Sequence, residues 1–360
     1  MSMEAGPISA IDVAGSDPLA RLLLTRWRLT PLQLALVFLL AGIGYLVGLA
    51  GLFGFLVARG QIFASLADPF NQLNFFFIFP GVAYYFLWQP GAIASVYLAI
   101  SQLAEKEPGE QDALWRDIKR THAHSRWWLA GLAVGLLGMA AGGYDNLSRL
   151  GVWWYAANPL MIVILQLARG LVFYMLIVSL TRHIAFTLSL NRCYRQFELP
   201  LAVLPTRSAG MRAVGQYAFS FTALAAIVAL NLGTAPVLTA KLGLDYPFQV
   251  AAYLVLAPSA FFLPLWQAHR YMARRRESIL NDLAERCQSE YARLIQGLSQ
   301  TNQDATQSLE RLRLLQDGYQ WTKKVSTWPI DTDLFYRLAA TIVAPFAFTL
   351  LQVLLDRLLR

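Results

Sequence analysis

Arg169 is the residue whose type and position most strongly suggest chemistry. It lies ten residues after Pro159 in a long apolar segment. In a helix this spacing places it about 15 Å from the outer end, close to the middle of a bilayer. A charge at that depth costs several kcal/mol unless it is paired or hydrated.

The possible partners of Arg169 within the apolar segments are uncharged, because no Asp or Glu occurs in those segments before the C-terminal region. They include Gln166, Asn231, Gln249 and backbone carbonyls. Two interpretations follow. In the first, Arg169 lines a hydrated path and attracts an anion or an anionic headgroup. In the second, amides and carbonyls hold it where helices pack, and Gly170 allows their close approach.

Prolines interrupt the second apolar segment at Pro80-Gly81 and at Gln89-Pro90-Gly91. Each proline frees a backbone carbonyl from the helical hydrogen-bond ladder. Channels and transporters use such broken helices to line a binding site, although kinked helices also arise from packing alone. We therefore expect a substrate or ion path, if one exists, to include Arg169, Gln166, Asn231 and Gln89.

Catalytic and metal-binding motifs are missing from the sequence. It contains no nucleophile elbow, HExxH, dinucleotide fingerprint or pair of intramembrane acids. His122-Ala123-His124 lacks an accompanying cluster of Cys or acidic residues, and Arg120 and Arg126 would repel a cation. We expect no metal, no cofactor and no enzyme activity.

Composition identifies the solvent of this chain as lipid. Hydrophobic residues make up 56% of the 360 positions and charged residues 14%, and the apolar runs reach the length of a bilayer. The predicted fold is an all-α, polytopic transmembrane bundle of six to seven spans. The six spans are Pro31–Val57, Leu73–Leu103, Trp127–Gly143, Pro159–Thr181, Gln216–Val237 and Phe248–His269; Leu338–Leu355 is a shorter seventh.

Basic residues set the predicted orientation, since Lys and Arg are retained on the cytoplasmic side. The connections on one side carry most of them, whereas the other side carries only Arg59, Arg149 and Lys241. This places residues 1–30, a charged leader, in the cytoplasm and residues 31–269 in the inner (cell) membrane. The net charge of +8 then reflects attraction to anionic lipids rather than to nucleic acid. The predicted headgroup contacts are Arg207, Arg212, Arg274, Arg275 and Arg276.

Residues 270–333 form a polar, helix-favouring domain before the C-terminal hydrophobic segment 334–360. Apolar residues such as Leu283, Leu294 and Leu315 recur at spacings of three and four, which is typical of a packed or coiled-coil helix. A return to the bilayer requires an antiparallel hairpin turning near residues 297–304. The alternative is one long helix. Residues 277–324 are the expected surface for a second copy or a cytoplasmic partner.

Two functional classes follow. The first is a channel or transporter with an anion-favouring Arg169. The second is a membrane-anchored sensor or scaffold that signals through the cytoplasmic helical domain. An intramembrane enzyme acting on lipid is the least supported of the alternatives.

Overall fold

The computed structural model describes residues 8–57, 64–103, 108–123, 126–148, 153–196, 209–238, 245–297, 302–328 and 332–359. The regular elements of these residues are helices, so the prediction of an all-helical chain is confirmed. In chain order they are α1 (Ala10–Ala14), α2 (Pro18–Arg21), η1 (Leu22–Arg26), α3 (Pro31–Ile43), η2 (Gly44–Leu49), α4 (Ala50–Leu52), η3 (Ser65–Ala67), α5 (Pro69–Leu73), η4 (Asn74–Ile78), α6 (Phe79–Leu103), α7 (Pro108–Ala123), α8 (Trp127–Ser148), η5 (Trp154–Ala156), α9 (Pro159–Gln196), α10 (Ala209–Leu238), α11 (Asp245–Gly297), α12 (Asn302–Lys324) and α13 (Thr332–Leu359).

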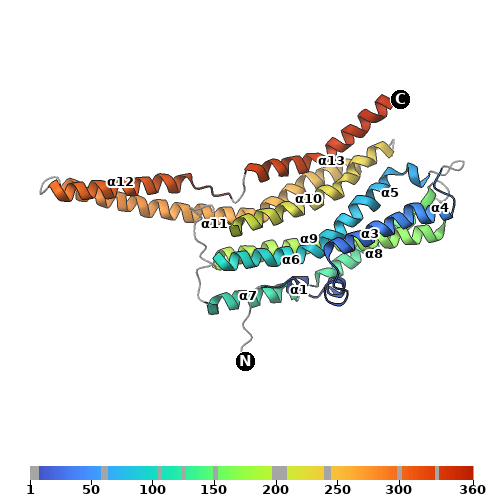
Figure 1. Cartoon of the computed structure of the whole chain (residues 1–360), viewed down its shortest axis with the longest axis horizontal. Helices are drawn as coiled ribbons and strands as arrows, with labels where there is room; N and C mark the ends of the chain where they lie inside the picture. The colour runs from blue at the N-terminus through green and yellow to red at the C-terminus, as the bar shows by residue number, and fades with distance from the viewer. Residues whose placement is uncertain are drawn as a thin grey trace.

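The N-terminal segment is folded onto the bundle rather than extended. Ser9 and Asp12 form a capping box at the start of α1, and Asp17 caps α2 directly before Pro18. α1 packs against α6 and α7 (Figure 1). Local capping therefore shapes residues that the sequence presents as a charged leader.

Helix α6 lies at the centre of the bundle, where it contacts α1, α3, α9 and α10. Its buried face includes Val82, Phe86, Ile93 and Tyr97, each fully enclosed. The helix continues without a break from α5 and η4, even though Pro90 lies inside it. The neighbouring helices bury α6 on several sides, so it needs less apolar surface than a helix that faces lipid.

Glycines bring α8 and α9 close together. Gly131, Gly135, Gly138 and Gly142 recur at spacings of four, three and four on α8. A Cβ atom on Gly135 would lie 2.7 Å from the carbonyl oxygen of Gly170 on α9. Small residues at such spacing let helix backbones approach one another inside a membrane.

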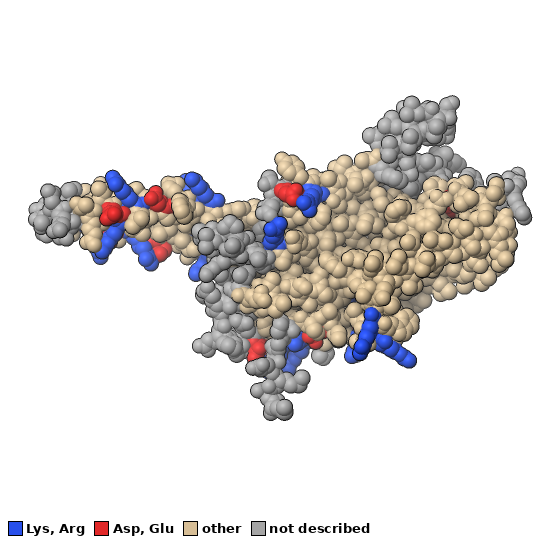
Figure 2. All heavy atoms as spheres, viewed as in Figure 1, with Lys and Arg blue, Asp and Glu red and all other residues tan. Residues whose placement is uncertain are grey.

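The polar domain forms a projecting pair of helices. α11 runs for 53 residues, out of the bundle and into this pair, and α12 lies beside its distal half (Figure 1). We call the distal half of α11 with α12 the hairpin. Beyond α12 the chain returns to the bundle, where α13 packs along α10. Lys, Arg, Asp and Glu gather over the hairpin and the adjoining end of the bundle, whereas most of the remaining bundle surface in Figure 2 carries other residues.

Four helical segments of the described part are long and apolar enough to cross a membrane: Pro31–Leu52, Asp112–Leu147, Pro159–Gln196 and Arg212–Asn231. They overlap four of the predicted spans, fewer than the six to seven expected. The segment Leu73–Leu103 falls short because Gln89, its prolines and its Tyr and Trp residues lower the mean hydropathy. Phe248–His269 and Leu338–Leu355 each include side chains outside the described part.

Candidate functional site

Helix α9 carries two arginines that face the interior of the bundle, Arg169 and Arg182. They are 13 residues apart, or about 20 Å along the helix. Each is associated with an Asp-Pro pair in which the Asp caps a short helix and the Pro occupies its first turn. We call these pairs the Asp17 corner and the Asp68 corner.

At the Asp17 corner the structure forms a buried ion pair. Arg182 donates through Nη2 to Asp17 Oδ2 and through Nη1 to the carbonyl oxygen of Phe86, at 3.1 Å. Tyr174 donates to the other Asp17 oxygen at 2.6 Å. The guanidinium also lies 4.7 Å from the centre of the Phe86 ring. Asp17 is 3% exposed and Arg182 6%, so the two charges are compensated within the protein.

Asp17 also fixes the start of α2. Its Oδ1 accepts hydrogen bonds from the backbone N–H groups of Leu19 and Ala20. Next to the pair, a cavity of about 20 Å³ is lined by Asp17, Arg182 and His122 among others, and this is room for about one water molecule. The corner therefore ties the N-terminal segment to α9 through both charge and capping.

The Asp68 corner lies nearer the start of α9. Asp68 is 1% exposed and accepts hydrogen bonds from the indole N–H of Trp154 at 3.0 Å and from the Asn71 side chain at 2.7 Å. Asn71 in turn accepts from Arg169 Nη2 at a long 3.4 Å. Side chains of a helix lean toward its N-terminus, so Arg169 extends toward this corner. The Asn71 amide thus connects the arginine to a buried carboxylate.

One turn further along the same helical run, Asn74 accepts a hydrogen bond from Asn231 of α10 at 2.9 Å. Asp68, Asn71 and Asn74 are three residues apart and are each at most 5% exposed. They form one polar row between α9 and α10.

A second polar group lies at the kink-prone part of α6. Gln89 Nε2 donates to the carbonyl of Ser179 at 2.8 Å and to the hydroxyl of Tyr217 at 3.0 Å. His183 stacks on Phe221 with ring centres 4.1 Å apart, and its Nε2 lies 2.9 Å from the Ala260 carbonyl. A carbonyl only accepts, so Nε2 carries the proton. We call Gln89, Ser179, His183 and Tyr217 the central polar cluster.

Several atoms of the central polar cluster lack a hydrogen-bond partner in the described part. They are Gln89 Oε1, Ser179 Oγ and His183 Nδ1. Buried polar atoms are normally paired with protein or water. Their grouping in one place indicates a site where water or a polar ligand would be stabilised.

No protein-family model matches the chain, and no curated protein or solved structure matches it either. The function is therefore inferred from the contacts of its side chains.

The four predicted path residues do not all gather at one place. Arg169 and Asn231 meet the polar row on neighbouring turns, through Asn71 and Asn74. Gln89 belongs to the central polar cluster, about 25 Å further along the helical run. Gln166 is 5% exposed, lies against Gly142 of α8, and neither of its amide atoms has a hydrogen-bond partner among the described residues.

Asp68 was not predicted as an acidic group near Arg169, because it lies in the connection before the second apolar segment. Asp17 and Arg182 were missed for a similar reason: one lies in the leader and the other follows the last apolar residue of its span. The signal that would have found the acids is the Asp-Pro pair itself, which is typical of an N-cap followed by the first helical turn.

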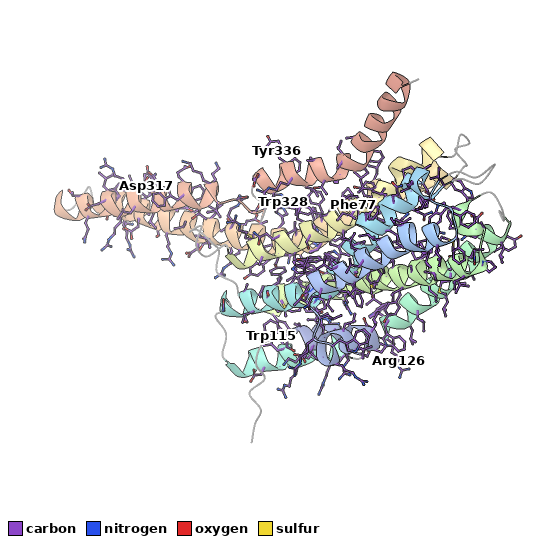
Figure 3. The ribbon with its side chains drawn as sticks, turned by 45° about the vertical axis from the view of Figure 1, so that its right-hand side comes forward. Phe77, Trp115, Arg126, Asp317, Trp328 and Tyr336 are labelled. Atoms are coloured by element: carbon purple, nitrogen blue, oxygen red, sulfur yellow. The ribbon has the colours of Figure 1, made fainter. Side chains whose placement is uncertain are left out.

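The base of the hairpin is fixed to α11 by side chains. His269 Nδ1 lies 3.1 Å from the Thr327 carbonyl, and its ring stacks on Trp328 with centres 4.2 Å apart. Arg276 Nη1 donates to the Val325 carbonyl at 3.2 Å. Trp328 is labelled in Figure 3, where it lies next to the end of α12. We call this region the hairpin root.

The predicted headgroup arginines have different environments. Arg276 contacts the hairpin root, whereas Arg274 and Arg275 are exposed and line a cavity. Arg212 is exposed near the start of α10, and Arg207 lies outside the described residues. Among the described residues, no group of three or more His, Cys, Asp and Glu side chains could hold a metal ion.

Proposed function

We propose that this protein is a membrane-anchored scaffold whose helical bundle holds a cytoplasmic hairpin in a fixed position for association with a second copy of the chain. One observation carries the proposal. α11 is a single helix from the bundle to the tip of the hairpin, and the hairpin root ties the end of α12 back to it. A hairpin held in this way has a defined position and direction relative to the membrane.

The membrane orientation in this proposal follows from charge. Basic residues lie in the N-terminal segment and around the hairpin root, at positions such as Arg26, Arg270 and Arg274. Charged side chains also gather at this end in Figure 2. The positive-inside tendency then places the N-terminus and the hairpin in the cytoplasm, and the bundle in the inner membrane of the cell.

The hairpin surface supports association. We call the row of side chains between α11 and α12 the seam of the hairpin. These side chains, including Leu283, Cys287 and Leu312, are only partly buried. Beside the seam lies a groove of about 760 Å³ lined by Cys287, Tyr291, Leu312 and Tyr319 among others. A pair of helices buries little of its own apolar surface. Packing it against a second helix pair would bury more and form a four-helix bundle. Symmetric pairing of identical chains is the commonest way to supply them.

The polar contacts of the bundle are consistent with an anchoring role. Arg182 is neutralised by Asp17, and Arg169 reaches a buried carboxylate through Asn71. Arg182 is thus paired with a carboxylate, and Arg169 has an amide partner that itself donates to a carboxylate. These contacts favour a packed Arg169 held by protein amides over an Arg169 that attracts an anion.

Cross-linking at Cys287 tests the proposal on the full chain. Cys287 lies in the groove, and the other cysteine, Cys193, is buried. In purified protein reconstituted into lipid nanodiscs that hold two copies, a short bis-maleimide should join two chains. The Cys287→Ser variant should give no product.

Two matched substitutions locate the contact. Gln320→Arg introduces a charge into the groove, and Gln307→Arg introduces the same charge on an exposed position of α12 that does not line the groove. We expect Gln320→Arg to weaken association at least about tenfold, which corresponds to about 1.4 kcal/mol, and Gln307→Arg to change it less than about twofold. A folded protein that stays monomeric by light scattering at high concentration would contradict the proposal.

A channel or transporter is the second candidate, favoured by the central polar cluster. Three buried atoms there have no hydrogen-bond partner among the described residues, and a cavity of about 620 Å³, lined by Trp88, Gly91 and Tyr217 among others, opens beside the cluster. Polar groups inside a membrane-spanning bundle that border a hydrated cavity are typical of substrate and ion pathways.

Liposome flux of chloride, phosphate and potassium tests this candidate. We expect Gln89→Leu to reduce any flux by about tenfold or more while the protein stays folded. Absence of flux in the parent protein would remove the candidate.

A further inference from the structure

A cavity lined with arginines lies between α9 and α11, close to the hairpin root. Its volume is about 540 Å³, within the range of ligand sites. Arg195 reaches it from the end of α9, and Arg270, Arg274 and Arg275 reach it from α11. Asn191, Gln267 and Ser278 contribute further polar groups to the lining. We call this cavity the arginine pocket.

The spacing of the residues shows that two helix faces build the pocket. On α11, the lining positions Arg270, Arg274 and Ser278 are four residues apart, so they lie on one side of the helix. Tyr194 of α9 and Tyr271 of α11 both line the pocket, and their rings stack with centres 6.2 Å apart. The helices are thus packed together at the pocket, and their arginines converge on a common space.

The charge of the pocket is not compensated by the described residues. No Asp or Glu is among its lining residues, and none of its four arginines forms an ion pair with a described acid. Arg192, three residues before Arg195, pairs with Asp117 at 2.8 Å. The C-terminal end of α9 offsets only about half a unit charge. Four converging guanidinium groups therefore favour an anion that can accept several hydrogen bonds.

The position of the pocket indicates where that anion comes from. Trp266 is 48% exposed and lies one turn before Arg270 on α11, and Trp residues prefer the level of lipid headgroups. Trp266 also packs near Trp328 at the hairpin root, with ring centres 6.2 Å apart. A helix that leaves a bilayer at Trp266 would place Arg270 and Arg274 among phosphates.

We infer that the arginine pocket is a binding site for a phosphate group, which an anionic phospholipid headgroup or a free phosphate could supply. Arg276 is not part of the site because it contacts Val325 instead. Occupation of the pocket would hold α9 and α11 together where the hairpin begins. The inference does not require association of two chains, so a monomeric protein would leave it standing.

Native mass spectrometry of the full chain in neutral detergent tests the site. Delipidated protein is titrated with phosphatidylglycerol and, separately, with phosphatidylcholine of the same chain length. The pocket variant is Arg270→Gln/Arg274→Gln. The matched control is Arg311→Gln/Arg313→Gln, which removes the same charge from exposed positions on α12. Circular dichroism is used to check that both variants remain folded.

The expected loss follows from about 1 kcal/mol per basic residue near anionic lipid, or about fivefold per arginine. The pocket variant should bind phosphatidylglycerol about 25-fold more weakly, and the control should stay within about twofold of the parent. Phosphatidylcholine should bind far more weakly than phosphatidylglycerol.

Inorganic phosphate identifies the source of the group. If it displaces phosphatidylglycerol no better than chloride at equal ionic strength, the site is one for a lipid headgroup. If it displaces the lipid at millimolar concentration and the pocket variant loses this effect, the site takes free phosphate. Equal lipid binding by the pocket variant and the control overturns the inference.

Discussion

Replacing Asp17 by Asn isolates the charge of the buried ion pair. Asn is as good an N-cap as Asp, so α2 keeps its cap, and the side-chain volume hardly changes. The substitution removes the negative charge that faces Arg182. Arg182 is itself only 6% exposed. The variant therefore leaves a buried guanidinium whose remaining contacts include the Phe86 carbonyl and ring.

The expected cost is large because both groups are enclosed. Removal of one partner of a buried pair costs about 3–5 kcal/mol. Arg182→Met should lower the free energy of unfolding by a similar amount, because the buried Asp17 carboxylate loses its cationic partner, although Tyr174 still donates a hydrogen bond to it. The double variant, Asp17→Asn/Arg182→Met, has no unpaired buried charge at this corner. It should be more stable than the sum of the single losses implies, with a coupling free energy of about 2 kcal/mol or more.

Unfolding in mixed micelles with a rising fraction of denaturing detergent, followed by circular dichroism, gives the free energies of this cycle. Trypsin digestion adds a local reading, because Arg21 and Arg26 lie in the N-terminal segment that the corner holds. Asp17→Asn should accelerate cleavage there before the bundle unfolds.

An exposed ion pair provides the control. Asp117 and Arg192 are 2.8 Å apart, but their side chains are 58% and 50% exposed. Such pairs contribute about 0–1 kcal/mol, so Asp117→Asn should change little. The reasoning fails if the two Asp→Asn variants lose equal stability, or if the Asp17 and Arg182 losses add within about 0.5 kcal/mol.

Two further predictions concern α8 and the Asp68 corner. Gly135→Ala should lower the free energy of unfolding by about 1–3 kcal/mol, because its Cβ would meet the Gly170 carbonyl; Gly143→Ala has open space and should be neutral or stabilising by up to about 1 kcal/mol. Equal effects of these two alanines in the same unfolding assay would contradict close packing of α8 on α9. Asp68→Asn should cost about 1–3 kcal/mol, since Asp68 accepts hydrogen bonds from Trp154 and from Asn71. Tryptophan fluorescence should show greater exposure of Trp154 to water. An unchanged spectrum together with unchanged stability would contradict the contacts of the Asp68 corner.

Hydropathy was sufficient to predict an all-helical chain, because bilayer-length apolar runs have few other structural solutions. The count of spans was not predicted correctly, because four candidate spans are found among the described residues and six to seven were expected. α6 shows why: a helix enclosed by neighbours can carry Gln89 and Pro90 and still be buried, so its composition no longer indicates its surroundings.

The polar contacts were less predictable than the helices. Arg169 was recognised as unusual from its depth, yet its connection to Asp68 spans about one hundred residues of sequence. Asp17 and Arg182 are still further apart. Such contacts depend on which helices become neighbours. The sequence alone restricts that choice only weakly, although the Asp-Pro pairs mark where a short capped helix could begin.

The hairpin root also limits how the hairpin can change in length. Each residue turns an α-helix by about 100°. A single insertion in the distal half of α11 would rotate its seam away from α12, because Arg276 and His269 hold the other arm in place. Paired insertions of about seven or about eleven residues, one in each arm, return both seams to within about 20°. The hairpin should therefore vary in length by steps of roughly 10 or 16 Å rather than one residue at a time.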